Sequence, residues 1–173
     1  VDNTLSAANV STMEAMGTRS AAAGVAETVR FLGGIATWRE LRSSHPRRRI
    51  LRAASDGTVI RASKGRYVLP TASAHFTTAQ SRTAVLSHLS APVHHGWQVK
   101  TVPTDAWVTV RRTRRLRRGQ REGIVPHWAA LDPGDVKHGV TTPLRTVLDC
   151  ARVLPFDEAL AVADSALRAR AIT

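Results

Sequence analysis

The most restrictive feature of this sequence is a close succession of helix stop and start signals in its first 70 residues. An Ala-rich run with Val25 and Val29 on one face ends at Gly33-Gly34, a typical helix terminus. The Thr37-x-x-Glu40 pattern of a capping box follows directly and predicts the start of a second helix. The region is therefore predicted to fold as several short helices rather than one long one.

A third helix and a hairpin are predicted to follow. His45-Pro46 interrupts the second helix, and Pro46 is suited to the first position of a third helix that ends at Ser55-Asp56-Gly57. Two β-rich runs, 58–61 and 67–69, flank a tip that contains Gly65 and predict a hairpin. Three short helices and a hairpin are the plan of a winged helix-turn-helix, so residues 20–70 are predicted to form a winged-helix DNA-binding domain.

The remaining segments are predicted from their composition and periodicity. Residues 1–19 show no sustained period and are expected to be a flexible N-terminal extension. Residues 71–97 are expected to form a helical connector, and residues 98–173 a small mixed α/β domain with a basic hairpin and two C-terminal helices. The predicted fold class is α+β.

The C-terminal domain carries both strand and helix patterns. Alternation from Ala106 to Val110 predicts a half-buried strand, and residues 124–131 are the expected return strand. A helix that begins near Pro143 is predicted to turn one apolar stripe inward, and a last helix is expected over residues 157–171. The predicted stripe consists of Leu144, Val147, Leu148 and Ala151.

The charge of the chain is strongly positive and unevenly distributed. The 173 residues include 25 basic and 13 acidic ones, a net charge of +12, and 22 of the basic residues are Arg. Residues 20–70 contain ten basic and three acidic residues, and residues 111–121 contain seven Arg and no acid. Codon bias toward Arg would spread the excess along the chain, so this concentration indicates a nucleic-acid ligand.

The predicted third helix and wing supply one group of candidate DNA ligands. Ile50, Leu51 and Ala54 are expected to face the core, while Arg47–Arg49 would read base edges in the major groove. The other cations would hold phosphates. The candidate residues in this group are Arg39, Arg47, Arg48, Arg49, Arg52, Arg61, Lys64 and Arg66.

The run between residues 111 and 121 supplies a second group. It would grip the nucleic-acid backbone or clamp RNA, although a solvated hairpin tip has the same composition. Trp107 and Trp128 flank it at strand spacing and are expected to lie in the core rather than to stack on bases. The candidate residues are Arg111, Arg112, Arg114, Arg115, Arg117 and Arg118, with Arg121 completing the run.

No catalytic residue, metal ligand or cofactor is predicted. The seven His residues lack the spacing of a zinc site, and Cys150 falls on the inner side of a predicted helix as an inert thiol. Asp135-Val136-Lys137, with Asp105 upstream, matches a nuclease-like metal step, but such a triplet is frequent by chance. The absence of any Asp-x-Asp argues against a nucleotidyltransferase. The protein is expected not to be an enzyme.

Several runs resemble one known family. "GGIATWRELR", "RRRILRAASDGTVIRASKGRYVLP", "VLSHLSAPVHHGW", "WVTVRR", "TTPLRTVLDCA" and "DEALAVADSALR" are similar to AbiEi-type abortive-infection antitoxins, over roughly residues 22–173. Related proteins join the same front part to a very-short-patch-repair-like (Vsr-like) endonuclease domain. The resemblance implies a self-regulating DNA-binding antitoxin paired with a nucleotidyltransferase-like toxin, or the targeting module of such a nuclease. The chain stops at Thr173, where the catalytic domain of the nuclease-bearing relatives would begin.

The expected function is sequence-specific binding of double-stranded DNA as an antitoxin-type transcriptional autorepressor. The alternative is the non-catalytic targeting module of a Vsr-like endonuclease whose nuclease domain is absent or truncated, and a third possibility is RNA binding. A cognate toxin and a second copy of the chain are the candidate protein partners. No apolar run is long enough to span a membrane and the first 20 residues lack a signal pattern, so a cytoplasmic location is expected.

Overall fold

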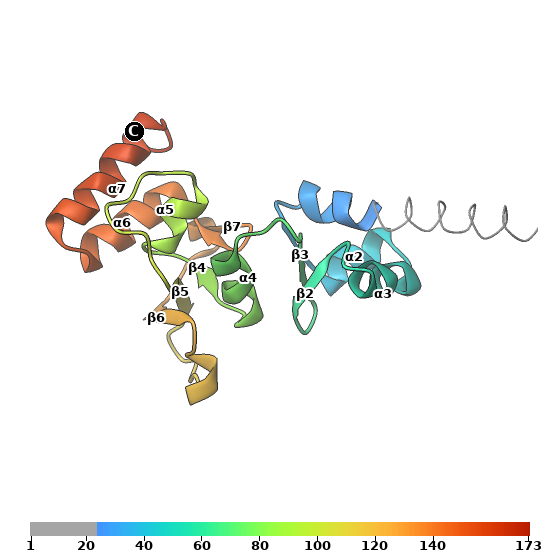
Figure 1. The fold of residues 1–173 in the computed structure, drawn as a ribbon. Helices are drawn as coiled ribbons and strands as arrows, with labels where there is room; N and C mark the ends of the chain where they lie inside the picture. The colour runs from blue at the N-terminus through green and yellow to red at the C-terminus, as the bar shows by residue number, and fades with distance from the viewer. Residues whose placement is uncertain (1–23) are drawn as a thin grey trace, which may run out of the picture. The chain divides into compact units, whose positions relative to one another are not determined.

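The computed structural model describes residues 24–173, which divide after Thr71 into two compact units (Figure 1). Each unit combines helices with a sheet of its own, so the fold is α+β as predicted. The expected N-terminal extension, residues 1–19, lies outside the described residues. No helix in the described part of the chain is long and apolar enough to cross a membrane.

The first unit contains the three predicted helices and the predicted hairpin. A third strand, which the sequence did not indicate, completes an antiparallel sheet of order β1-β3-β2 by pairing Ile35 with Val68. The elements are a helix over residues 24–31, β1 (Ile35–Thr37), α2 (Trp38–Ser44), α3 (Arg47–Ser55), β2 (Ile60–Ser63) and β3 (Arg66–Val68).

Local signals set the helix ends of this unit. Gly34 has a φ of 89° and its N–H donates to the Val29 carbonyl at 2.8 Å, which ends the first helix. The capping box is present: the Glu40 N–H donates to Thr37 Oγ1 at 3.2 Å, and the Thr37 N–H donates to Glu40 Oε2 at 2.6 Å. Pro46 is the N-cap residue of α3, whereas the sequence predicted it as the first helical residue.

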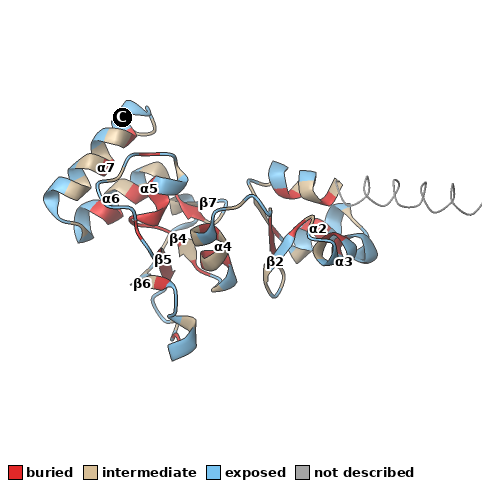
Figure 2. Cartoon of the chain, viewed as in Figure 1, coloured by how far each residue is buried: buried red, intermediate tan, exposed pale blue. Residues whose placement is uncertain are grey.

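The core of the first unit is small and apolar. Ile50 and Ala53 are the fully buried residues of α3, and Ala54 is partly buried. Figure 2 shows buried stretches alternating with exposed ones in this unit. Leu51, which was expected to face the core, is 43% exposed, because it lies about 100° around the helix from Ile50. The other buried members of the core are Val25, Val29, Ala36, Leu41, Val59 and Tyr67.

The second unit is built on a mixed five-stranded sheet of order β6-β5-β4-β8-β7. Its elements are α4 (Ala74–Ser81), β4 (Val85–Leu86), α5 (Ser90–His94), β5 (Ala106–Arg111), η1 (Arg118–Gln120), β6 (Ile124–Ala129), η2 (Pro133–Asp135), β7 (Val136–Lys137), β8 (Val140–Thr141), α6 (Pro143–Val153) and α7 (Phe156–Arg168). The segment expected to be a helical connector, residues 71–97, contains β4 and thus contributes a strand to this sheet.

The predicted hairpin between β5 and β6 is wrong. The two strands are present, but they pair in parallel, with Ala106 opposite Ile124 and Arg111 opposite Ala129. Residues 112–123, here called the arginine loop, therefore run back along the strands as a crossover that contains η1. A crossover between parallel strands needs about a dozen residues, whereas an antiparallel pair can be joined by two.

The predicted inward stripe of α6 is also wrong. Thr146, Asp149 and Cys150 are buried, whereas Leu144 and Leu148 are exposed. Two of these buried residues have partners that compensate for their polarity: Thr146 Oγ1 lies 2.7 Å from Thr141 Oγ1, and Asp149 pairs with Arg145. α6 therefore buries two polar residues beside Cys150 and leaves Leu144 and Leu148 uncovered, and of the predicted stripe only Val147 packs against the core cluster that contains Cys150.

Candidate nucleic-acid interface

The outward side of α3 carries arginine at the positions opposite the core. Arg48 and Arg52 each lie about 200° around the helix from Ile50, which is fully buried, and both are exposed. Leu51 is exposed beside Arg48, which it precedes by about 60° around the helix and follows by three residues in the chain. We call this surface, Arg48, Leu51 and Arg52, the α3 face. Arg47 and Arg49 are exposed on its two flanks.

The electrostatics of the α3 N-terminus favour an anion. The first turn holds Arg47–Arg49 and no acidic residue, and Pro46 provides no side-chain cap. The helix dipole adds partial positive charge at this end, so three cations here cost stability until a negative ligand approaches. Within residues 24–173, none of the seven cations Arg39, Arg47, Arg48, Arg49, Arg52, Arg61 and Lys64 forms an ion pair.

A partly buried histidine connects α3 to the first helix. His45 lies just before Pro46, and its Nε2 is 2.7 Å from the Thr28 hydroxyl. Burial, followed by the charge of the nearby Arg49 guanidinium, lowers the pKa of His45 and so favours the neutral ring. His45 Nδ1 is buried without a hydrogen-bond partner.

The hairpin adds cations at its tip and on β2. Arg61 and Lys64 are exposed, while Arg66 is partly buried and already interacts within the chain. The Gly65 carbonyl accepts a hydrogen bond from the Trp38 N–H at 2.7 Å, which fixes the tip against the start of α2. Gly65 has a φ of 77°, a conformation that glycine allows in this tight turn.

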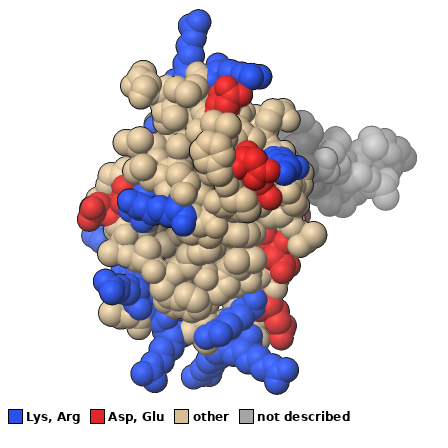
Figure 3. All heavy atoms as spheres, turned by 90° about the vertical axis from the view of Figure 1, so that its left-hand side faces the viewer, with Lys and Arg blue, Asp and Glu red and all other residues tan. Residues whose placement is uncertain are grey.

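The arginine loop is an ordered part of the second unit. Leu116 is buried, and Arg114 Nη1 donates to the Thr83 carbonyl at 2.9 Å, so Arg114 is held against the protein. The remaining guanidinium groups of the run belong to Arg111, Arg112, Arg115, Arg117, Arg118 and Arg121, and all of these residues are exposed. Figure 3 shows basic atoms gathered at the lower end of its view, where Figure 1 places this loop.

Trp128 lies beside this loop and is not a core residue, contrary to expectation. Its side chain is 41% exposed, its Nε1 donates to the Arg114 carbonyl at 2.9 Å, and the Arg121 guanidinium lies 5.6 Å from its ring centre. Trp107, by contrast, is partly buried and stacks on His127 with ring centres 5.1 Å apart. An exposed indole among arginines provides a flat surface on which an unpaired base can stack.

One of the two nuclease-like carboxylates, Asp135, is engaged in an ion-pair network. Asp135 Oδ2 accepts from Arg145 Nη1 at 2.9 Å, and Arg145 Nε donates to both carboxylate oxygens of Asp149. Asp105 and Lys137 are exposed. The Arg145 guanidinium therefore already neutralises Asp135, one of the two carboxylates that a metal would need. Among residues 24–173, no group of three His, Cys, Asp or Glu side chains is arranged to hold a metal ion.

Two further titratable groups of the second unit, His88 and Cys150, are buried. His88 stacks on His127 with ring centres 3.7 Å apart, and burial, followed by the charges of His127 and Arg145, lowers the pKa of His88 to about 3. Cys150 is fully buried, and burial, assisted by the Asp149 carboxylate, raises the pKa of its thiol to about 12. A thiol with so high a pKa is a poor nucleophile, in line with the expected inert role.

The structure thus groups the predicted residues by unit. The first unit holds the cations of α3, which are Arg47, Arg48, Arg49 and Arg52, together with Arg39 on α2 and the cations of the β2–β3 hairpin. The second unit holds the residues from Arg111 to Arg118. Next to these cations, Leu51 and Trp128 are exposed, although the sequence pattern assigned both to the core. No protein-family model matches the sequence, and no curated protein matches it either.

Proposed function

We propose that this protein binds double-stranded DNA sequence-specifically through α3 and the β2–β3 hairpin, and that it acts as an antitoxin-type transcriptional repressor. The observation that carries the proposal is the first turn of α3, where three exposed Arg residues stand at the positive end of a helix with no acid and no ion pair. A folded protein gains nothing from this arrangement alone, because it opposes the helix dipole. When a DNA backbone is bound, its phosphates interact favourably with both the Arg residues and the positive end of the helix dipole, so the arrangement becomes stabilising.

The α3 face would enter the major groove. The forked guanidinium groups of Arg48 and Arg52 fit the O6 and N7 acceptors of guanine, and Leu51 beside Arg48 can contact a thymine methyl group. An exposed leucine beside an arginine fits base reading better than backbone contact, because a phosphate offers it no apolar partner. Three helices followed by a hairpin is the element order of a winged helix, in which the third helix reads bases.

The other cations would hold the DNA backbone. Arg61 and Lys64 on the hairpin and Arg39 on α2 are exposed and lack ion pairs within the described residues, so phosphates are suitable ligands for them. Arg47 and Arg49 flank the α3 face and would contact the strands on either side of the groove. The exposed residues of the arginine loop would add a grip that does not depend on sequence.

The regulatory role rests on the family resemblance in the sequence. An antitoxin of this type would repress its own operon and bind a nucleotidyltransferase-like toxin through its second unit. The targeting module of a Vsr-like endonuclease is the alternative, and it would use the same DNA-binding surface. A reporter gene fused to the chain's own upstream region separates the two, because only a repressor lowers its expression.

Fluorescence anisotropy tests the DNA-binding proposal. The full chain is titrated with a duplex from its own upstream region and with a scrambled duplex, and we expect at least about 1,000-fold preference for the former. An Arg48→Ala/Arg52→Ala variant should lose that preference. Arg30→Ala, which removes another exposed arginine of the first unit, is the control and should retain it. Equal affinity of the wild-type chain for both duplexes contradicts sequence-specific binding.

A second candidate function, binding of single-stranded nucleic acid or RNA, is favoured by one observation. Trp128 is exposed, and the Arg121 guanidinium lies near its ring, so a base and its phosphate would both find partners there. Under this alternative, Trp128→Ala weakens binding of a single-stranded oligonucleotide, while the α3 variant leaves that binding unchanged. Competition between the upstream duplex and the single strand shows which ligand is preferred.

A further inference from the structure

The two C-terminal helices leave an apolar surface uncovered. On α7, Phe156 is 81% exposed and Leu160 is 53% exposed, and together with Ala163 and Leu167 they recur at spacings of four, three and four residues. This is the spacing at which a helix packs along another helix. On α6, Leu144, Leu148 and Ala151 repeat the pattern and are exposed.

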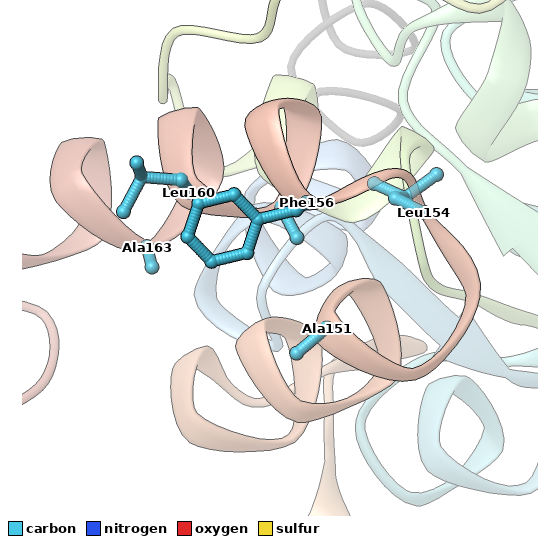
Figure 4. A pocket seen from close by; sticks show the side chains of 6 residues that line it. Ala151, Leu154, Phe156, Leu160 and Ala163 are labelled. Carbon is cyan, nitrogen blue, oxygen red and sulfur yellow. The ribbon is translucent and has the colours of Figure 1, made fainter.

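A groove runs between these stripes. Its volume is about 340 Å³, and every residue that lines it is apolar: Ala151, Leu154, Phe156, Ala159, Leu160 and Ala163. Figure 4 shows the Phe156 ring and the Leu160 side chain on α7, facing the side of α6 that carries Ala151. Small-molecule sites combine apolar walls with a few converging polar groups. No side chain that lines this groove is polar, so a helix with apolar side chains fits it better than a small ligand does.

The distribution of charge around this surface is compatible with a second copy of the chain as the partner. The chain as a whole has a net charge of +12, so two copies repel each other over most of their surface. Residues 143–173 carry no net charge, with four basic and four acidic residues, so this repulsion is weakest where α6 and α7 lie. Figure 3 faces the side where Figure 1 places α6 and α7 and shows a broad uncharged area with most charged atoms around it.

The ends of α7 also match each other when two copies run antiparallel. Asp157 and Glu158 lie in its first turn and Arg168 lies in its last. A two-fold axis near Leu160 and Ala163 would place Phe156 against Leu167 of the second copy and bring the basic end of each helix to the acidic end of the other. A parallel pair would place acid against acid. In the antiparallel pair, the positive end of each helix dipole also lies beside the negative end of the other, which is favourable.

We infer that the α6–α7 groove is the surface through which two copies of this chain pair, with their α7 helices antiparallel. The pairing would join two α6–α7 hairpins into a four-helix arrangement. The inference uses the second unit alone and does not rest on the proposed function. A chain that dimerises but does not bind DNA would support this inference and contradict the proposed function. A chain that binds DNA as a monomer would do the opposite.

Sedimentation velocity on the full chain tests this inference. We expect the molar mass obtained for the wild-type chain to be twice the monomer mass of 18.7 kDa. Phe156→Glu should raise the dissociation constant by about 30-fold or more, as is usual for a buried aromatic anchor. Phe31→Glu is the matched control, because Phe31 is an 89% exposed phenylalanine of the first unit, and it should leave the dimer intact. Circular dichroism verifies that both variants are folded.

Charge reversal tests the orientation. Arg168→Glu should weaken the dimer, and Glu158→Arg added to it should restore the dimer, because the two positions exchange charges across an antiparallel pair. The existing Arg168–Asp164 pair within α7 is exposed and contributes little, so its removal does not account for such a rescue. A wild-type chain that remains monomeric at ~100 μM, or a dimer that Phe156→Glu leaves unchanged, overturns the inference.

Discussion

Arg48 and Arg52 differ from the other basic residues of the first unit in the chemistry expected of them. Both lie opposite the buried Ile50, on the side of α3 that is free to enter a groove. The sequence predicted a basic third helix correctly but placed Leu51 in the core, and the exposure of Arg52 beside Arg48 is our reason for now proposing that Arg52 reads bases rather than holds a phosphate. Because Ala53 is buried instead of Leu51, α3 is turned about its axis relative to the predicted orientation. A few apolar residues in a short helix do not determine which of them face the core.

The Arg48→Lys variant tests base reading at this residue. Lysine keeps the charge but lacks the planar fork that binds guanine at two atoms. We expect the affinity for the upstream duplex to fall by about 1–3 kcal/mol and the affinity for a scrambled duplex to stay unchanged. Titrations of both duplexes at one salt concentration measure the difference. An equal decrease for both would mean that Arg48 contacts only phosphate.

His88 predicts how the stability of the second unit depends on pH. Its pKa is lowered to about 3 in the folded protein from an ordinary value of 6.5, so the unfolded chain takes up the proton first. Its contribution is therefore complete above about pH 6.5 and is lost as the pH falls toward 3. Below pH 6.5, this one group should reduce the free energy of unfolding by about 1.4 kcal/mol for each pH unit.

Urea unfolding at pH 7 and pH 5 measures this effect. His88→Asn should make the dependence on pH less steep, and Asn tolerates the positive φ of 45° at this position. His138→Asn is the control, because His138 is exposed with a similar φ of 52°. His94, His95 and His127 also have lowered pKa values, so part of the dependence should persist. An unchanged slope in His88→Asn would contradict the role assigned to its burial.

At the scale of elements, the charge of α3 lowers the stability of the free protein. Three Arg residues in a first turn without an acid oppose the helix dipole. Arg47→Glu should therefore stabilise the fold by about 0.3–1 kcal/mol and at the same time weaken DNA binding. Thermal unfolding and anisotropy on the same samples measure both quantities. Destabilisation by Arg47→Glu would show that the native arginine makes a favourable contact in the free protein.

The ends of helices could be predicted where a few adjacent residues determine them, whereas the pairing of strands could not be predicted. The Thr37–Glu40 capping box and the Gly33-Gly34 terminus depend on a few adjacent residues, so the sequence revealed them. The parallel pairing of β5 with β6 depends on contacts between strands, and an alternating pattern is the same in either direction. The apolar side of α6 was read as its buried side, because the compensating partners of Asp149 and Thr146 lie elsewhere in the chain or one turn away.

At the scale of the whole molecule, the positive charge is divided between two units with different expected roles. The α3 face should set specificity, whereas the arginine loop should add affinity without specificity. An Arg115→Ala/Arg117→Ala/Arg118→Ala variant should weaken binding of the upstream and scrambled duplexes alike. The slope of log K against log salt should become less steep by about 0.9 for each phosphate that the variant no longer neutralises. Weaker binding of the upstream duplex alone would instead assign base reading to the loop.

An NMR titration of the full chain with its upstream duplex tests whether α3 and the hairpin form the DNA interface. We expect the largest changes in amide chemical shift in residues 47–55 and 60–66, with smaller and strongly salt-dependent changes in the arginine loop. Changes confined to residues 111–128, with α3 unaffected, would rule out α3 as the DNA interface and favour the single-stranded or RNA-binding alternative.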